Sequence, residues 1–377
     1  MPLSTLADYR IDESRGFVPG TDPLTALPPE LRDWDRLAGD LSAHLRSGSL
    51  IEALGDLPPF EVDLLTSEAL RERGLLLLTI LANACVWGGP EPRRTIPASV
   101  AVPLAALAGE LDRPAIVHYG SMTLQNWRRV RADRPLCVEN AEMQIMFLGG
   151  VDESWFYIAS LGVELAGAPL VGLVHQCTDL SHDAGDDDLT ACLERIAAGM
   201  PAVQRATART YEWCDPHMFY TRIRPYVNGW PEEGVVYEGV SETPRRLIGG
   251  SAGQSSLLQM LDALLAVDHS AGPAGSYLRA VRNYMPLGHR AFVNDVERLS
   301  RVRARASAGS PALRAAYNAV LHEIAAFRKI HLRLAHDYVF VPSGMAAKER
   351  GTGGTEAMDF LDGARRETVE AMLQGTG

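Results

Sequence analysis

Few of the patterns that identify a common protein class occur in this chain. Its five cysteines are odd in number, scattered, and never two residues apart, which argues against a disulfide framework and against a thiolate zinc site. HExxH is absent, no two histidines stand four residues apart, and no CxxCH occurs. These absences exclude a helical zinc-protease site, and any haem would be held without thioether links.

Long runs of one charge or of apolar residues are missing as well. The formal charge of −11 is spread along the chain, which disfavours a nucleic-acid or anionic-membrane partner. The longest apolar stretch, residues 75–87, is interrupted by polar residues and is shorter than the ~20 residues that span a bilayer. Residues 1–15 lack the apolar segment of a secretion signal. We therefore expect a cytoplasmic protein that binds neither nucleic acid nor a membrane.

Apolar residues recur with a helical period over most of the 377 residues, and 46% of all residues are hydrophobic, which is ample for a packed core. Only residues 235–237 and 340–342 read as short strands. The predicted fold class is all-α. Helices are expected over residues 31–45, 67–86, 119–132, 137–148, 153–178, 189–213, 216–227, 254–268, 274–283, 289–304, 311–338 and 356–373.

Glycine and proline become frequent after residue 87. Two glycines at 88 and 89 and prolines at 90, 92, 97, 103 and 114 predict an extended or turn-rich stretch, because proline removes a backbone donor and glycine favours turns. We expect this stretch to join two domains. The predicted organisation is a small N-terminal helical domain (1–108), a linker (109–118) and a large helical domain (119–377).

The strongest single signal is a histidine within an apolar helical stripe. Steps of three and four residues connect Leu313, Tyr317, Val320, Ile324, Phe327, His331, Leu334 and Tyr338, which places them on one helix face. His322 and His336 lie off that face. A buried imidazole needs partners for its nitrogens. Two interpretations stay open: a haem-iron ligand, or a core histidine bonded to a backbone carbonyl.

Two glycine-rich runs also have both a functional and a structural interpretation. Residues 249–256 lead into an apolar helix, so their backbone could approach an anion or a flat ligand, but a turn followed by an N-cap explains them about as well. The run lacks the lysine of a phosphate loop. Residues 351–355 are a candidate lid or a flexible connector.

Two polar residues stand in apolar or aromatic helical segments. Ser160 shares a face with Phe156 and Val163, which indicates a polar group in a pocket, or a serine bonded back to its own helix. Arg224 precedes Pro225, whose ring bends a helix. The guanidinium could pair with a substrate carboxylate, or form an exposed salt bridge.

Several segments together resemble the indoleamine 2,3-dioxygenase family. They are FLGGVDESWFY, FYTRIRPYVNGW, GGSAGQSS, YMPLGHRAF, AFRKIHLRLAHDYV and GTGGT, in that order and spacing. Upstream, ACVWGG and IPASVAVPLAALAGELDRPAIVHYG resemble the small domain and linker of that family. The resemblance covers about residues 12–375.

The resemblance implies an all-helical, two-domain protein with haem b in the large domain and His331 as the proximal iron ligand. Around the haem it implies Arg328 near the propionates, a close backbone approach at Ser251 and Ala252, and contacts from Val163, Leu258, Leu334 and Tyr338. For the substrate it implies Arg224 at the carboxylate, Thr352 at the ammonium, Ser160 as the distal hydroxyl, and Tyr119, Met122, Phe156 and Phe219 in the pocket.

In this family O2 is inserted across the indole C2–C3 bond of L-tryptophan to give N-formylkynurenine, the first step of tryptophan catabolism through kynurenine. We therefore expect a haem- and iron-dependent oxidoreductase with O2 as co-substrate, a small indole amino acid as its substrate, and a monomeric or weakly homo-oligomeric state. Met122 and Thr123 stand where mammalian members carry Cys and Val, and residues 343–350 are shorter than the mammalian loop.

These departures keep alternatives open. One is the same scaffold acting on a modified tryptophan or indole in secondary metabolism, inserting either one oxygen atom or two. Another is a non-catalytic haem sensor, although a sensor has no use for a carboxylate partner such as Arg224. A third is a helical hydrolase or transferase without haem, which would show no Soret band.

Overall fold

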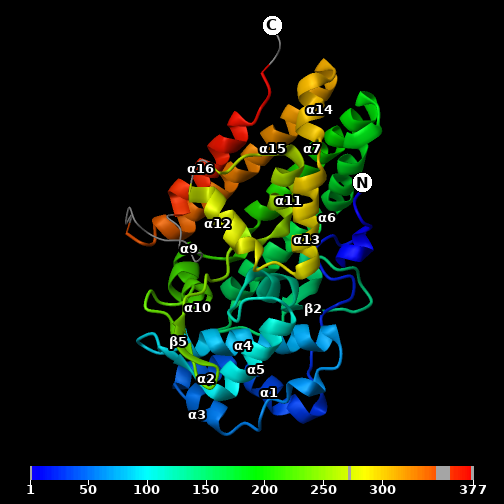
Figure 1. The fold of residues 1–377 in the computed structure, drawn as a ribbon. Coiled ribbons are helices and arrows are strands. Elements are labelled where there is room, and N and C mark those ends of the chain that lie inside the picture. The colour runs from blue at the N-terminus through cyan, green and yellow to red at the C-terminus, as the bar shows by residue number, and fades with distance from the viewer. Residues whose placement is uncertain (1, 271–272, 345–356, 375–377) are drawn as a thin grey trace.

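Helices make up most of the structure, and the strands are short and few (Figure 1). The computed structural model describes residues 2–270, 273–344 and 357–374. The all-α class that the helical periodicity predicts is confirmed. Two hydrophobic clusters form the core, one centred on α4 (Glu68–Trp87) and one on the long helices of the C-terminal half.

Helix α4 is the centre of the N-terminal half. The Ser67 hydroxyl accepts the Leu70 amide at 3.2 Å and so caps the helix. Every residue from Glu72 to Val86 is buried, which explains why the stretch is apolar on all sides. Around it in Figure 1 lie α1 (Arg32–Gly39), α2 (Leu41–Ser47), α3 (Leu50–Gly55) and α5 (Ala98–Glu110). The 3₁₀ turns η2 (Pro29–Leu31) and η3 (Val62–Leu64) belong to the same part of the chain.

The expectation of an extended stretch after residue 87 is wrong for α5. Pro97 stands at the N-cap, where the missing amide costs no hydrogen bond, and Pro103 lies inside the helix. Val100, Leu104 and Leu107 are fully buried. Burial of this apolar segment against α4 outweighs the local cost of Pro103.

The first seventeen residues pack away from the helices that follow them. The 3₁₀ turn η1 (Leu6–Tyr9) rests on α13 (Leu287–Leu299), where Tyr9 meets Phe292 with ring centroids 5.4 Å apart. Phe17 also contacts Phe292, and both belong to the C-terminal core cluster. The division into domains at 1–108 and 119–377 stays a prediction. The first residues of the predicted N-terminal domain pack on α13, which lies in the predicted C-terminal domain.

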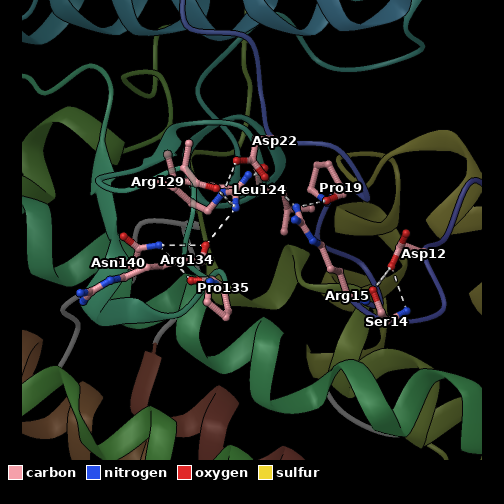
Figure 2. A network of polar contacts seen from close by, with 12 residues as sticks. Asp12, Ser14, Arg15, Pro19, Asp22, Leu124, Arg129, Arg134, Pro135 and Asn140 are labelled. Atoms are coloured by element: carbon pink, nitrogen blue, oxygen red, sulfur yellow. Dashed lines mark hydrogen bonds and ion pairs between the residues drawn. The ribbon is translucent and has the colours of Figure 1, made fainter.

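The helices predicted over 119–132 and 137–148 are wrong. In their place stand the π-helical turn η4 (Gly120–Leu124), a hairpin of β2 (Trp127–Arg129) and β3 (Ala141–Met143), and the 3₁₀ turn η5 (Val138–Asn140). Asparagine side chains explain why this segment is not helical, because their amide groups form hydrogen bonds with backbone groups that would otherwise pair within a helix. Asn140 donates to the carbonyls of Arg131, Arg134 and Pro135 (Figure 2).

An ionic contact joins this hairpin to the N-terminal segment. Asp22 accepts hydrogen bonds from Arg15 at 2.9 Å and from Arg129 at 2.5 Å (Figure 2). The two arginines hold the pKa of Asp22 below its usual value, although burial acts in the opposite direction. The chain before α1 is therefore attached to the hairpin as well as to α13, and further bonds join it to α6 and α4.

Long helices build the C-terminal half. The longest are α6 (Val151–Asp183), α7 (Asp186–Ala208) and α15 (Pro311–Ala335). Both α6 and α15 pack on α7 and on α11 (Ser256–Leu265). The remaining elements are α8 (Thr210–Trp213), α9 (Pro216–Met218), η6 (Phe219–Ile223), α10 (Arg224–Val227), η7 (Ala252–Gln254), α12 (Pro273–Arg282), α14 (Val302–Ala308), η8 (His336–Phe340) and α16 (Ala357–Glu370).

Strands contribute one more small sheet. Strand β4 (Val235–Tyr237) pairs in parallel with β1 (Thr95–Ile96) and antiparallel with β5 (Ser241–Arg245), which confirms the strand predicted at 235–237. The strand predicted at 340–342 is wrong, because the chain after α15 continues as the π-helical turn η8.

Helix α6 carries two features that the sequence did not predict. Cys177 pairs with Cys192 of α7 as a disulfide, a pair that the scattered cysteines of the sequence did not indicate. The two helices form a hairpin that brings residues fifteen apart to a Cα distance of 6.0 Å. By length and composition α6 is also apolar enough to cross a membrane, but 56% of its most apolar window is buried inside the fold, as in a core helix.

Candidate functional site

The helix that carries His331 is well determined by its sequence. Ser310 caps α15 by accepting the Leu313 amide at 3.2 Å, and Pro311 occupies the first turn. The predicted stripe faces the core, since Leu313, Tyr317, Val320 and Ile324 are fully buried. His322 and His336 are exposed, as expected for positions off the stripe.

His331 differs from the rest of this stripe. Its side chain keeps some accessible surface, and neither ring nitrogen forms a hydrogen bond with any residue in the part of the chain that the structure describes. Its one ring neighbour is Phe327, at 6.2 Å between centroids. The interpretation as a core histidine bonded to a carbonyl therefore does not hold within the described chain.

Burial lowers the pKa of His331 to about 4, and the positive charge of Arg328 acts in the same direction. The imidazole is consequently neutral at neutral pH, with a lone pair available to a metal. Among residues 2–270, 273–344 and 357–374 there is no group of three His, Cys, Asp or Glu side chains that could hold a metal ion. A single imidazole donor such as His331 thus fits a metal whose other ligands come from its own cofactor, as in a porphyrin iron.

A second accessible face lies on α6. Phe156, Ser160 and Val163 are partly exposed, whereas Tyr157 and Leu161 beside them are buried. The Ser160 hydroxyl donates to the Phe156 carbonyl at 2.9 Å, so the structural interpretation of this serine is confirmed. Its oxygen can still accept a hydrogen bond, because a hydroxyl has two lone pairs.

Aromatic rings connect this face to the end of the His331 helix. The rings of Phe156 and Phe219 lie 4.6 Å apart, and those of Phe219 and Tyr338 lie 5.7 Å apart. The Tyr338 hydroxyl donates to the Cys214 carbonyl at 2.6 Å, which fixes this ring. Residues from α6, η6 and η8 are thereby brought together although they are far apart in the sequence.

Three π-helical turns coincide with predicted site residues. Tyr119 precedes η4, Phe219 begins η6 and Arg224 follows it, and Tyr338 lies in η8. A π-helical turn costs stability and is found frequently at functional sites. No periodicity signal predicted them, because one extra residue per turn is not visible in an apolar pattern.

Arg224 lies at the junction of η6 and α10, next to Pro225. Its guanidinium carbon is 5.0 Å from the centroid of the Tyr220 ring, and the side chain is partly buried. The bend expected before Pro225 is present as the change from π-helix to α-helix. The guanidinium therefore lies on the same segment as Phe219.

Residues 249–256 form a turn followed by a helix cap, as the structural interpretation predicted. The Ser255 hydroxyl accepts the Leu257 amide at 3.2 Å and caps α11. A Cβ on Gly249 would collide with the backbone of Val227 and Gly229, so this glycine allows the run to approach the segment after Arg224. Leu258 and Ser251 are partly exposed, and Ala252 is exposed.

Residues Gly249 to Gly253 match the GxSxG sequence motif that is typical of serine hydrolases. The structure contradicts a nucleophile elbow here, because Ser251 precedes a 3₁₀ turn and its hydroxyl accepts from Tyr277 at 2.9 Å and from the Gly253 amide. No histidine bonds Ser251 within the described chain. The contact of Ser251 and Ala252 with a haem stays a prediction.

Arg328 lies one helical turn before His331 and is buried. Its guanidinium donates to Asp262 of α11 at 2.6 Å and to the Thr368 hydroxyl of α16. His269 touches Asp262 at 3.2 Å and Glu367 at 2.6 Å. Sequence analysis missed Asp262 and His269, since neither stands in a recognisable motif.

The other predicted residues are placed as follows. Leu334 is buried near the C-terminal end of α15. Met122 is buried inside η4, and its sulfur lies 3.9 Å from the side-chain nitrogen Nδ2 of Asn126. Tyr119 is partly exposed, and its hydroxyl donates to Glu164 at 2.9 Å. Thr352 lies outside the described residues, so its role stays a prediction.

The helical architecture defines an all-α protein, and within its described residues the neutral imidazole of His331 suits a haem iron. Comparison with known proteins gives the family. The model of the family described as indoleamine 2,3-dioxygenase matches residues 5–371. The chain belongs to the indoleamine 2,3-dioxygenase family, whose members are haem dioxygenases.

Relatives from animals and fungi match over nearly their full length. Indoleamine 2,3-dioxygenase 1 of Rattus norvegicus is 32% identical over 98% of this chain and 96% of its own. Indoleamine 2,3-dioxygenase of Saccharomyces cerevisiae is 31% identical over 98% and 94%. The 6-hydroxytryptophan 2,3-dioxygenase of Fusarium equiseti is 28% identical over 98% of both chains.

Proposed function

We propose that this protein inserts both atoms of O2 across the indole C2–C3 bond of L-tryptophan, giving N-formylkynurenine. The observation that carries the proposal is the neutral, unbonded imidazole of His331 in a chain that belongs to this family from residue 5 to 371. Haem, when bound, supplies the oxygen chemistry. The residues of the chain supply binding, orientation and exclusion of water.

Each group has a defined part in this proposal. His331 holds the iron from one side, and Arg328, already paired with Asp262, meets the propionates. Arg224 binds the substrate carboxylate through its planar guanidinium. Phe156 and Phe219, whose rings touch, form the wall on which the indole lies, with Ser160 as a polar group near it.

The test is turnover by ferrous protein with L-tryptophan and O2, followed by the absorbance of N-formylkynurenine. Arg224→Ala should raise the KM by roughly 10- to 100-fold, since a hydrogen bond to a charged group contributes about 1.5–3 kcal/mol. Arg222→Ala, an exposed arginine two residues earlier, is the control and should leave the KM unchanged. A haem spectrum without product from any indole amine would favour the sensor alternative.

A second candidate substrate is a ring-substituted tryptophan. Two observations favour it: Met122 and Thr123 are both buried in η4, at positions where mammalian members carry Cys and Val, and one relative is named for 6-hydroxytryptophan. Comparing kcat/KM for L-tryptophan and 6-hydroxytryptophan decides between them. A preference for the hydroxylated amino acid would replace L-tryptophan as the proposed substrate.

A further inference from the structure

Glu164 of α6 is a buried carboxyl group without a cationic partner among the described residues. Its side chain is 2% exposed, and it lies one helical turn after Ser160. The Tyr119 hydroxyl donates to Oε1 at 2.9 Å, and the Ser255 hydroxyl donates to the same oxygen at 2.6 Å. The other oxygen, Oε2, is buried and accepts no hydrogen bond from any residue that the structure describes.

This one-sided arrangement fits an acid better than an anion. In a carboxylate both oxygens carry charge, and a buried charged oxygen without a donor is costly. In a carboxylic acid the carbonyl oxygen accepts two hydrogen bonds, and the group left without a partner is a neutral O–H, which costs less to bury than a charged oxygen. Burial also raises the pKa of Glu164, and the two hydroxyl hydrogen bonds do not offset that effect.

Glu153 on the same helix shows the contrasting arrangement. It is equally buried, at 2% exposed, but both of its oxygens accept backbone amides. Oε1 accepts the Phe147 amide, and Oε2 accepts the amides of Leu148 and Gly149. The two glutamates are therefore equally buried but differ in their partners: Glu153 accepts three backbone amides and lies near the charge of Arg222, whereas Glu164 accepts only two hydroxyls.

Glu164 connects three separate parts of the proposed site. Tyr119 precedes η4, and its amide donates to Gln254 at 2.8 Å. Ser255 caps α11 at the end of the 249–256 turn. Glu164 itself is on the helix that carries Phe156 and Ser160. A change at this carboxyl group would release the turn and Tyr119 from α6 together.

We propose that Glu164 is a neutral carboxylic acid that acts as a positioning residue: its carbonyl oxygen holds Tyr119 and the 249–256 turn against α6, and its proton stays on Oε2. The inference rests on the proposed function only in taking Tyr119 to border the tryptophan site. Tyr119, Ser255 and Glu164 form no contact with His331 in the described chain, so the role is separate from metal binding.

The test uses haem-loaded protein and three variants. Glu164→Gln keeps a neutral side chain with a carbonyl acceptor, and its NH2 group takes the place of the O–H; it should keep the KM for L-tryptophan within about twofold. Glu164→Leu removes both hydrogen bonds and should raise that KM by about tenfold. Glu153→Gln turns an NH2 group toward backbone donors and should lower the midpoint of thermal unfolding, whereas Glu164→Gln should not.

Infrared spectroscopy gives a readout that a purely structural role would not change. The protein at neutral pH should show a carbonyl stretch of a protonated carboxylic acid that is lost in Glu164→Gln. Absence of that band, or a Glu164→Gln variant as impaired as Glu164→Leu, overturns the neutral acid. An unchanged KM in Glu164→Leu overturns the positioning role.

Two safeguards keep the outcomes separate. If Glu164→Leu does not fold, Tyr119→Phe removes one of the two hydrogen bonds and should raise the KM, and an unchanged KM there counts against the proposal. If the protein shows no Soret band or forms no product, the proposed function fails, while the infrared band and the unfolding of the two glutamine variants still decide the state of Glu164.

Discussion

At the scale of single residues, His331 differs from the rest of its stripe because its imidazole keeps some accessible surface and forms no hydrogen bond in the described chain. Ordinary buried polar groups find hydrogen bonds, and Ser160, Asn140 and Arg328 all do. His331 instead stays neutral, with no hydrogen bond in the described chain. Such an imidazole keeps a lone pair that no side chain of the described chain uses, which is why this residue predicts a bound group.

Replacing His331 by Ala should abolish the normal Soret spectrum of the reconstituted protein, because the proposed axial ligand is removed. His322→Ala, an exposed histidine on the same helix, should keep that spectrum and serves as the control. Far-UV circular dichroism checks that both variants fold. A normal five-coordinate haem spectrum with full turnover in His331→Ala would contradict the assignment.

At the scale of elements, glycine positions show where helices pack closely. In α13 a Cβ on Gly288 would collide with the Tyr9 carbonyl of η1, so this glycine permits the N-terminal segment to dock. A Cβ on Gly109, near the end of α5, would meet nothing within 4 Å. The two residues therefore test packing and helix propensity separately.

Gly288→Ala should destabilise the protein by about 1–3 kcal/mol through overpacking against η1. Gly109→Ala should be neutral or stabilise it by up to about 1 kcal/mol, because alanine favours the helix. Denaturant unfolding of both variants measures the difference in free energy. Equal stabilities would show that η1 does not pack on α13 as described.

At the scale of the whole molecule, a buried ionic cluster joins α11, α15 and α16. Asp262 and Glu367 face Arg328 and His269, so the charges balance only when His269 is protonated. Burial lowers the pKa of His269, but the hydrogen bond and charge of Asp262 together with the hydrogen bond of Glu367 outweigh burial and raise the pKa above its ordinary value of 6.5. Burial likewise raises the pKa of Asp262, but Arg328 and His269 bring it below 3.8.

These shifts fix the pH dependence of stability. The contribution of His269 is complete below pH 6.5 and is lost as the pH rises through its folded pKa, and that of Asp262 is complete above pH 3.8 and is lost on acidification. His269→Gln should therefore flatten the decline of the unfolding midpoint above pH 6.5. His322→Gln is the control, and an unaltered decline in His269→Gln would contradict the prediction.

Local pattern predicted the helices that are long and periodic. The stripe from Leu313 to Tyr338 specified α15 and the direction of His331, since residues three and four apart share one face whatever surrounds them. Residues 119–148 could not be predicted in this way, because Asn126 and Asn140 bond distant backbone groups there. The other site residues were predicted from the family resemblance, which does not tell which side chains they contact.

The sequence by itself determined the helical class, the face of α15 that carries His331, and the family, because each depends on residue types at fixed spacing. Tertiary structure alone decided the π-helical turns at Tyr119, Phe219 and Tyr338, the Cys177–Cys192 pair, and the hydrogen bonds of Glu164. Those features depend on which buried groups meet across the fold, and a partner far along the chain leaves no periodic signal.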